Sequence, residues 1–314
     1  AGIAVAPTLT SLSLSNSNYF IAGIDAAMTA AITPASVTVS GLSVANKVYD
    51  GTTAATVLGT PTAFGVLSGD NVTVNGAVSA AFVSTNVASG IAVTANLTGL
   101  SLSNANYQIT GMAVNLAADI APAPLTVTAD NKSMVYGSST PALTFTYSGL
   151  VGGDTSASFN GAIATNASST SSVGSAYTIT QGTLASSSAN YRIATFNAGS
   201  FSIGARPLTV IVDAGQSKVY GSADPSSFSA TIQTQGTDVG LLAGDTLGGS
   251  LARAVGENAG VYAISSGSIV AANPNYAITF VGDNFAVTPR PITITANSGQ
   301  SKVCLLYTSD AADE

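Results

Sequence analysis

Lys47-Val48-Tyr49-Asp50-Gly51 is a short stretch that returns along the chain at almost constant spacing. It recurs as Met-Val-Tyr-Gly at 134–137 and as Lys-Val-Tyr-Gly at 218–221, so Tyr49, Tyr136 and Tyr220 lie 87 and 84 residues apart. A second marker, Asn-Tyr, ends at Tyr19, Tyr107, Tyr191 and Tyr276, with separations of 88, 84 and 85. This period is longer than the roughly 20–50 residues of solenoid repeats and fits one small domain of roughly 50–200 residues. The spacing therefore predicts a tandem array of small domains.

Apolar and polar residues alternate within each repeat, which is the period-2 pattern of a strand with one face in a core. The pattern is clearest at the repeat openings, Val37-Thr38-Val39, Leu125-Thr126-Val127, Leu208-Thr209-Val210 and Ile292-Thr293-Ile294. Clusters of glycine, asparagine and serine between these runs are typical of turns. We predict an all-β fold with at least four or five strands per repeat. Two topologies stay open, a β-sandwich-like domain of the immunoglobulin kind and a β-grasp-like sheet with a short helical crossing.

Proline precedes the opening strand of each repeat and marks the predicted boundaries, at Pro34, Pro122, Pro207 and Pro289. The predicted domains are the C-terminal part of a truncated repeat at 1–33, three repeats at 34–121, 122–205 and 206–289, and the start of a further truncated repeat at 290–303. Short junctions with a fixed proline φ limit hinge motion. We therefore expect the array to form an extended rod.

Residues 304–314 do not fit the repeat pattern. Residues 300–303 repeat 216–219, so the motif tyrosine is expected at position 304, where Cys304 stands. The segment from Cys304 onward resembles the one-frame translation of a transposase sequencing adaptor, and we interpret it as a non-native tail. Without it, residues 1–303 carry twelve acidic and eight basic side chains, a net charge of −4, and no cysteine, histidine or tryptophan.

This composition excludes several classes of function. Without histidine or cysteine there is no base for a serine nucleophile, no thiol nucleophile and no His or Cys metal ligand, so we predict no catalytic residue, no cofactor and no enzyme activity. Scattered basic residues on an acidic chain do not form a phosphate-binding face, so we expect no nucleic-acid partner. No apolar run approaches the ~18 residues of a membrane span, so we expect no membrane insertion.

The motif tyrosines Tyr49, Tyr136 and Tyr220 have two interpretations: exposed rings that stack on sugars, or core rings whose hydroxyl ties down a turn. We favour the core interpretation, and the same holds for Tyr107, Tyr191 and Tyr276. Asp70, Asp154 and Asp245 each follow a glycine, which suits either a turn or a calcium site. Calcium needs six to eight oxygen ligands, and acidic residues are sparse, so we predict turns and no calcium. All nine residues are thus predicted to be structural markers of the repeat.

These motifs carry a resemblance to known families. Lys-Val-Tyr-Asp-Gly-Thr-Thr at 47–53, Leu-Ser-Gly-Asp at 67–70 and Ser-Asn-Ala-Asn-Tyr at 103–107 resemble the YDG repeat of bacterial surface exoproteins. The Val-Tyr-Gly motifs at 135–137 and 219–221, each followed by a proline, resemble the related MBG repeat. The third repeat departs slightly from it through a longer insert before Val261-Tyr262. The resemblance covers nearly all of 1–303.

Such repeats resemble the building blocks of large secreted proteins of the filamentous haemagglutinin type. The resemblance implies a Gram-negative bacterial source, an extracellular or cell-surface location, and a stalk or spacer that projects a distal binding domain and adds weak multivalent contacts. The implied partners of the full-length adhesin are host or surface glycans or proteins. Two alternatives stay open: the repeats are themselves carbohydrate- or receptor-binding β modules, or they form a spacer within a larger secreted enzyme.

Overall fold

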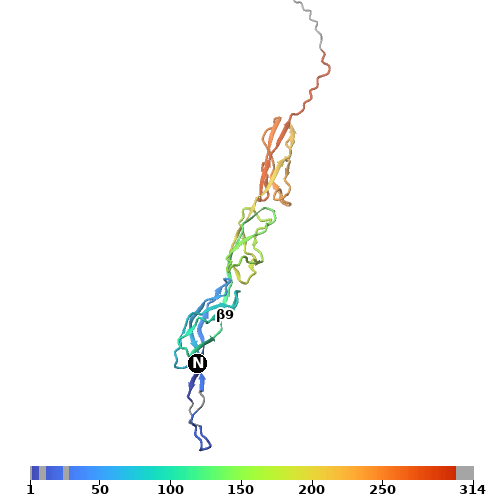
Figure 1. Ribbon diagram of the computed structural model, residues 1–314. Helices are drawn as coiled ribbons and strands as arrows, with labels where there is room; N and C mark the ends of the chain where they lie inside the picture. The colour runs from blue at the N-terminus through green and yellow to red at the C-terminus, as the bar shows by residue number, and fades with distance from the viewer. Residues whose placement is uncertain (1, 7–11, 24–27, 302–314) are drawn as a thin grey trace, which may run out of the picture. The chain divides into compact units, whose positions relative to one another are not determined.

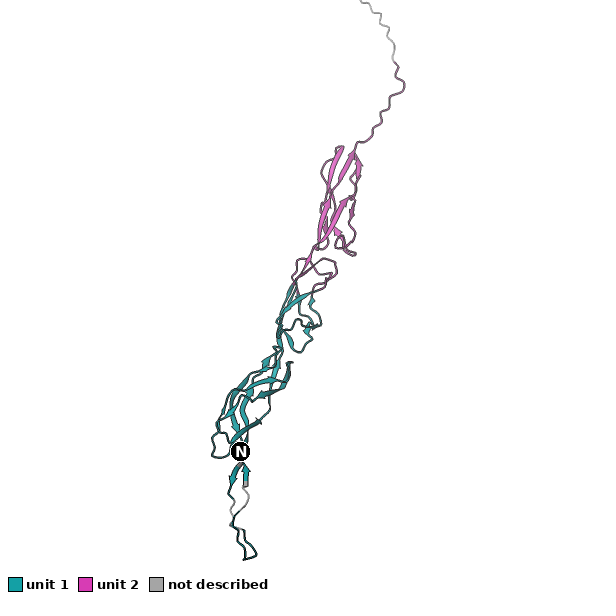
Figure 2. Cartoon of the chain, viewed as in Figure 1, with its two compact units in different colours: residues 1–130, 143–165, 179–199 teal, residues 131–142, 166–178, 200–314 magenta. Residues whose placement is uncertain are grey.

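The computed structural model describes residues 2–6, 12–23 and 28–301, and these residues contain strands and turns but no helix (Figure 1). The all-β prediction is confirmed, and the β-grasp-like alternative is not supported because no helical crossing occurs in this part of the chain. The predicted non-native tail lies outside the described residues. The chain divides into two compact units, unit 1 with residues 1–130, 143–165 and 179–199, and unit 2 with residues 131–142, 166–178 and 200–314 (Figure 2).

The first complete repeat lies in unit 1 and is a sandwich of two main sheets. One sheet has the order β11-β3-β6, the other β4-β12-β9-β8-β5, and β10-β7 forms a small third pair. The strands are β3 (Ala35–Val44), β4 (Lys47–Val48), β5 (Ala54–Ala55), β6 (Val57–Phe64), β7 (Val74–Asn75), β8 (Ser79–Phe82), β9 (Ala88–Asn96), β10 (Ser101–Leu102), β11 (Tyr107–Met112) and β12 (Leu116–Ala121). Two pairings are parallel, β3 with β11 and β4 with β12.

The alternating sequence of this repeat sets its burial. In β3, Val37 and Val39 point into the core while the residues between them are more exposed, as period-2 alternation requires. The facing sheet contributes side chains such as Phe82 and Ile120 to a buried cluster. That cluster continues past the predicted boundary at Pro122, because it also contains Leu125 and Tyr191 of the second repeat.

The remainder of unit 1 holds a hairpin and part of the second repeat. The hairpin pairs β1 (Gly2–Val5) antiparallel with β2 (Met28–Ala31). The opening sheet of the second repeat has the order β15-β13-β20, with β13 parallel to β20 and antiparallel to β15. Its strands and the small neighbouring ones are β13 (Ala123–Ala129), β15 (Phe145–Ser148), β16 (Phe159–Asn160), β17 (Ala164–Thr165), β19 (Ala185–Ser186) and β20 (Tyr191–Asn197).

Unit 2 contains the parallel pair of β14 with β21 and the whole third repeat. The third repeat has one sheet in the order β24-β22-β29 and one in the order β23-β30-β27-β26, with β25-β28 as a separate pair. The strands are β14 (Lys132–Val135), β21 (Gly199–Gly204), β22 (Arg206–Val212), β23 (Ser217–Val219), β24 (Ala230–Ile232), β25 (Leu247–Gly248), β26 (Ala252–Arg253), β27 (Gly260–Ser265), β28 (Val270–Ala271), β29 (Tyr276–Val281) and β30 (Asn284–Thr288). Val212, Ile264, Phe285 and Val287 form its buried cluster.

The division into units does not follow the predicted repeat boundaries. The second repeat contributes β13 and β20 to unit 1 and β14 to unit 2, and β18 (Tyr177–Thr180) lies where the chain passes between the units. Unit 1 therefore includes the start of the second repeat together with the end of the first. Unit 2 likewise includes the end of the second repeat together with the start of the third. Each unit thus contains one complete junction between two repeats.

Candidate functional site

A short strand places each tyrosine motif beside the C-terminal end of the last strand of its repeat. The strands β4, β14 and β23 precede the three motif tyrosines and pair in parallel with the last strand of their own repeat. The amide of each tyrosine then donates to a carbonyl of that last strand: Tyr49 to Ala121 at 2.8 Å, Tyr136 to Gly204 at 3.0 Å and Tyr220 to Thr288 at 2.9 Å. The repeated sequence therefore places the three tyrosines equivalently.

The second tyrosine of each repeat, that of the Asn-Tyr marker, binds the aspartate of the Gly-Asp turn. We call this tyrosine and this aspartate together the acceptor site of the repeat. Its hydroxyl donates to a carboxylate oxygen: Tyr107 to Asp70 Oδ2 at 2.5 Å, Tyr191 to Asp154 Oδ2 at 2.6 Å and Tyr276 to Asp245 Oδ2 at 2.5 Å. The same hydroxyl accepts the amide N–H of Leu67, Val151 or Leu242, three residues before the aspartate. The acceptor site is thus built in the same way in all three repeats.

These contacts hold the tyrosines in their neutral form. Burial and the hydrogen bond to Asp245 raise the pKa of Tyr276 to about 12. Burial, followed by the bond to Asp154, raises the pKa of Tyr191, whereas the bond to Asp70 is the main cause that raises the pKa of Tyr107. A phenol beside a carboxylate resists ionisation because the tyrosinate would face a second negative charge.

In unit 1 the motif tyrosine of the first repeat occupies the acceptor site of the second. The rings of Tyr49 and Tyr191 meet edge to face, with centroids 5.5 Å apart and an interplanar angle of 78°. The Tyr49 hydroxyl donates to Asp154 Oδ2 at 3.2 Å, so one carboxylate accepts both hydroxyls. Tyr49 is 8% exposed. Its ring is therefore part of a core that crosses the boundary between repeats.

Backbone contacts complete this junction. Gly51 and Gly152 approach so closely that a Cβ on Gly152 would lie 2.6 Å from the Gly51 Cα, and both glycines have positive φ. Asn190 Oδ1 accepts the amide of Val87 at 2.9 Å, and Asn190 Nδ2 donates to Asn86 Oδ1 at 3.1 Å. The asparagine of the Asn-Tyr marker therefore binds a turn of the preceding repeat.

Unit 2 repeats the arrangement at the next junction. The rings of Tyr136 and Tyr276 meet edge to face at 5.7 Å and 77°, and Tyr136 is 8% exposed. Asn275 Oδ1 accepts the amide of Val173 at 2.8 Å. Gly137 packs against Leu242, since an added Cβ would lie 2.3 Å from the leucine Cδ1. The same two markers therefore make the same contact twice.

Arg206 adds a feature that the first junction lacks. Its side chain is 2% exposed and donates to four backbone carbonyls: Nε to Gly240 at 2.8 Å, Nη1 to Tyr136 at 3.1 Å, and Nη2 to Gly236 at 2.7 Å and Val239 at 2.8 Å. Ala123 stands at the equivalent position of the first junction. Its amide donates to the Asn190 carbonyl, just as the Arg206 amide donates to the Asn275 carbonyl. The guanidinium thus joins a turn of the third repeat to the tyrosine motif of the second.

Tyr220, the third motif tyrosine, lies in a different environment from the other two. It carries the same backbone bond as Tyr49 and Tyr136 but is 48% exposed. Its predicted core position is therefore wrong. For Tyr49 and Tyr136 burial is observed, but the neighbour that buries each ring is the next repeat, and the hydroxyl of Tyr49 ties down a turn of that repeat rather than of its own.

The aspartate turns are as the sequence indicates. The amides of Asp70, Asp154 and Asp245 each donate to the carbonyl three residues earlier, at 3.1–3.2 Å. The additional role of their carboxylates, binding the Asn-Tyr hydroxyl, was not part of the sequence prediction. The sequence signal from which this role could have been predicted is the constant separation of Asp and Tyr, 37 residues in the first two repeats.

The third repeat contains a charged cluster that sequence reasoning missed. Lys218 pairs with Asp224 at 2.6 Å and with Glu257, and Arg253 binds the same two carboxylates at 2.7 and 2.6 Å. Lys218 is buried. Hydrogen bonds from Arg253 and Lys218 lower the pKa of Asp224 to about 2, and those from Lys218 and Arg253 lower the pKa of Glu257. Both carboxyls are held ionised, so neither suits a general acid.

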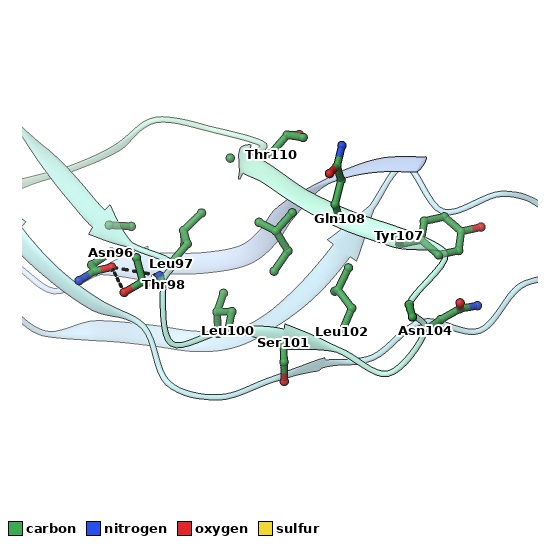
Figure 3. Close-up of a pocket in the computed structure, with 14 residues that line it drawn as sticks. Asn96, Leu97, Thr98, Leu100, Ser101, Leu102, Asn104, Tyr107, Gln108 and Thr110 are labelled. Atoms are coloured by element: carbon green, nitrogen blue, oxygen red, sulfur yellow. Dashed lines mark hydrogen bonds between the residues drawn. The ribbon is translucent and has the colours of Figure 1, made fainter. Parts of the chain in front are cut away.

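A surface hollow in the first repeat is the other candidate site. Three leucines, Leu97, Leu100 and Leu102, lie along it, and Tyr107 stands at one end with its hydroxyl directed away from them (Figure 3). Tyr107 is the aromatic residue of this lining and is 5% exposed, so its face is not free for a sugar ring. The hollow, which leucines and polar side chains line together, therefore offers no aromatic face for stacking.

The described ranges are 2–6, 12–23 and 28–301, and within them no group of three or more His, Cys, Asp or Glu side chains is placed to hold a metal ion. Within the same ranges, no helix is long and apolar enough to cross a membrane. The tyrosine junction is the polar arrangement that occurs twice in this part of the chain.

Sequence models of two known domain families match this chain. The sequence model of the MBG domain (YGX type) matches residues 125–202 and 208–286, which together make half of the chain. The model of the YDG domain matches residues 33–114. A comparison with curated proteins gave no match. The matched ranges contain the acceptor tyrosines Tyr107, Tyr191 and Tyr276 and all three Tyr-Gly or Tyr-Asp-Gly motifs. The chain therefore belongs to the MBG (YGX type) domain family, with a YDG domain in front of its two MBG domains.

Proposed function

We propose that this chain is a structural stalk or spacer of a bacterial cell-surface or secreted adhesin, in which the repeats are locked end to end and hold a binding domain away from the cell. The observation that carries the proposal is the buried tyrosine junction. Tyr49 and Tyr136 each leave their own repeat and complete the hydrophobic packing of the next one. Repeats joined in this way resist bending more than repeats joined by a flexible linker.

Two further features support a structural role. The core cluster of unit 1 runs from Phe82 through Tyr49 to Leu125, so burial is continuous across the junction. The side chains that form the junctions are tyrosine, asparagine, glycine and leucine, together with an aspartate that accepts hydroxyl groups. Such groups stabilise packing, and we assign them no chemical step.

The extracellular location and the adhesin context are parts of the same proposal. MBG and YDG domains are repeat modules, and the low charge of the chain, 7% of residues, suits a surface rich in hydroxyl and amide groups. Labelling of intact cells of the source bacterium with an antibody against the repeats tests the location. Signal that appears only after the cells are lysed contradicts it.

Small-angle X-ray scattering of the intact chain tests the stalk. A compact protein of this length has a radius of gyration of about 20 Å, and an extended array is expected to exceed that value about twofold. The double variant Tyr49→Ala/Tyr136→Ala should keep its strands but show a broader distribution of interatomic distances, because both junctions lose their central ring. A compact wild-type chain contradicts the stalk.

Binding of glycans by the motif tyrosines has less support. Two of the three rings are buried in junctions, and Tyr220 is exposed only where no repeat follows in the described chain. A glycan array probed with the intact chain separates the two functions. Specific binding that is lost in Tyr220→Ala favours a carbohydrate-binding module over a spacer.

A further inference from the structure

The acceptor site of the YDG domain differs from the other two because no motif tyrosine of the described residues occupies it. Tyr107 and Asp70 have the same hydrogen bond as Tyr276 and Asp245, and Leu67 stands where Leu242 stands in the third repeat. No Tyr-Gly motif occurs before residue 49 in the printed chain. The acceptor site is therefore complete but has no ring from within this chain.

A surface pocket lies where that ring belongs. Thr33, Leu67, Asp70 and Tyr107 are among the residues that line it. Leu67 is 64% exposed, whereas its counterpart Leu242 packs against Gly137 of the preceding repeat. The empty pocket and the exposed leucine both match the footprint of a Tyr-Gly motif.

The neighbouring hairpin lacks a strand at the corresponding place. In the complete repeats, the last strand pairs in parallel with the strand that carries the motif, as β12 does with β4 and β30 does with β23. The strand β2 leads into Pro34 as β12 leads into Pro122, yet among the described strands β2 pairs with β1 alone. Thr33, two residues before Ala35, corresponds to Ala121, whose carbonyl accepts the Tyr49 amide.

We infer that the pocket at Thr33, Leu67, Asp70 and Tyr107 is a binding site for an extended peptide segment that carries Val-Tyr-Gly. The segment adds as a parallel strand to β2 and donates its tyrosine amide to the Thr33 carbonyl. Its ring enters the pocket beside Asp70 and meets the hydroxyl edge of Tyr107, whose face is covered within its own repeat. Its glycine packs over Leu67 as Gly137 packs over Leu242, because any side chain there meets the leucine. The site deepens the proposed spacer function, since it assigns the recognition rule by which repeats join.

A synthetic peptide with the sequence of residues 216–223, blocked at both ends, tests the site against the intact chain by isothermal titration calorimetry or fluorescence anisotropy. Saturable one-to-one binding is expected, with a Kd on the order of 10–1000 μM for so small an interface. Replacing the peptide tyrosine by alanine should weaken binding about tenfold or more, because the buried ring and its edge-to-face contact are lost. A peptide with valine in place of the glycine should also bind more weakly.

Two variants of the chain locate the binding. Leu67→Asp alters the pocket at a side chain that is 64% exposed, so the domain should still fold, and it should abolish peptide binding. Val83→Asp is the matched control, because Val83 belongs to the same domain, is 65% exposed and does not line the pocket. Absence of binding to the wild-type chain, or equal affinities for Leu67→Asp and Val83→Asp, overturns the inference. The scattering result above is independent, so the site and the stalk fail separately.

Discussion

At the scale of single residues, Tyr49 and Tyr220 stand in the same motif and make the same backbone bond, yet one ring is buried and the other is half exposed. The difference is the acceptor site formed by Tyr191 and Asp154, which is present for Tyr49. The stability that a motif tyrosine contributes is therefore a property of the junction. It is not a property of the motif alone.

The first prediction uses this pair. Tyr49→Ala should lower the free energy of unfolding by about 3 kcal/mol, as truncation of a buried aromatic ring does. Tyr220→Ala should change it by less than about 0.5 kcal/mol, as most substitutions of exposed side chains do. Urea unfolding followed by circular dichroism measures both values. Equal losses in the two variants would show that the ring stabilises its own repeat.

The second prediction concerns adjacent glycines. Gly152 and Gly153 both have positive φ, 66° and 83°, so alanine at either costs about 1 kcal/mol of backbone strain. At Gly153 nothing lies within 4 Å of an added Cβ, whereas at Gly152 the Cβ meets the Gly51 Cα. Gly152→Ala should therefore be more destabilising by a further 1–3 kcal/mol or so. Matching thermal unfolding curves for the two variants would contradict the close approach.

At the scale of elements, each junction is formed by the end of one repeat and two turns of the next. The Gly-Asp turn and the Asn-Tyr turn together form the acceptor site, and the strand β4 or β14 delivers the ring. In the second junction, Arg206 also fills a turn whose carbonyls at 236, 239 and 240 all face its guanidinium. That turn includes Asp238, whose φ is +59°. A positive φ is uncommon for a residue other than glycine, so the contacts of the turn must stabilise this conformation.

The third prediction tests this arginine. Arg206→Met removes the hydrogen bonds from the buried guanidinium to four backbone carbonyls and should cost about 2–4 kcal/mol. Arg206→Lys should recover little of the loss, because an ammonium group cannot reach carbonyls arranged around a planar fork. Arg290→Met is the control, since Arg290 occupies the equivalent sequence position but is exposed. Chemical denaturation of all three variants gives the comparison.

The fourth prediction concerns alkaline pH. Tyr276 has its pKa raised to about 12 in the folded chain from about 10 in the unfolded chain. The folded state therefore holds its proton more tightly, so this contribution to stability is complete below pH 10 and is lost as the pH rises from 10 to 12. Tyrosinate absorbance should show late-titrating groups, with Tyr276 among them, because the pKa values of Tyr107 and Tyr191 are raised as well. In Asp245→Asn, Tyr276 should titrate earlier, because the neighbouring negative charge is gone.

At the scale of the whole molecule, repeats that share a junction should unfold together. A linear array gains stability from each repeat and from each interface between neighbours. As a fifth prediction, Tyr136→Ala should split a single calorimetric transition into two, since it weakens the contact with Tyr276 while leaving each repeat's own core intact. A single transition in the variant would show that the coupling resides elsewhere in the chain.

Much of the fold was predictable from the sequence, and the junctions were not. Alternation at Val37 and Val39 and the period of the Tyr-Gly motif are local signals, and they predict strands and repeats directly. The partner of Tyr49 is a carboxylate 105 residues away, and alternation of apolar residues carries no information about such a pairing. Arg206, beside a proline, has the sequence signature of an exposed charge, and only the carbonyls of its turn explain its burial.

The second repeat carries one half of each of two junctions: a motif tyrosine that enters the next repeat, and an acceptor site that receives the tyrosine of the previous one. A segment of DNA that encodes one repeat therefore encodes both contact surfaces that the repeat needs, so the repeat can join to any neighbour of the same kind. Unequal recombination that duplicates or deletes such a segment leaves every remaining contact unchanged. We expect the length of these arrays to vary among related strains in whole steps of one repeat, so that reach can evolve without any new interface.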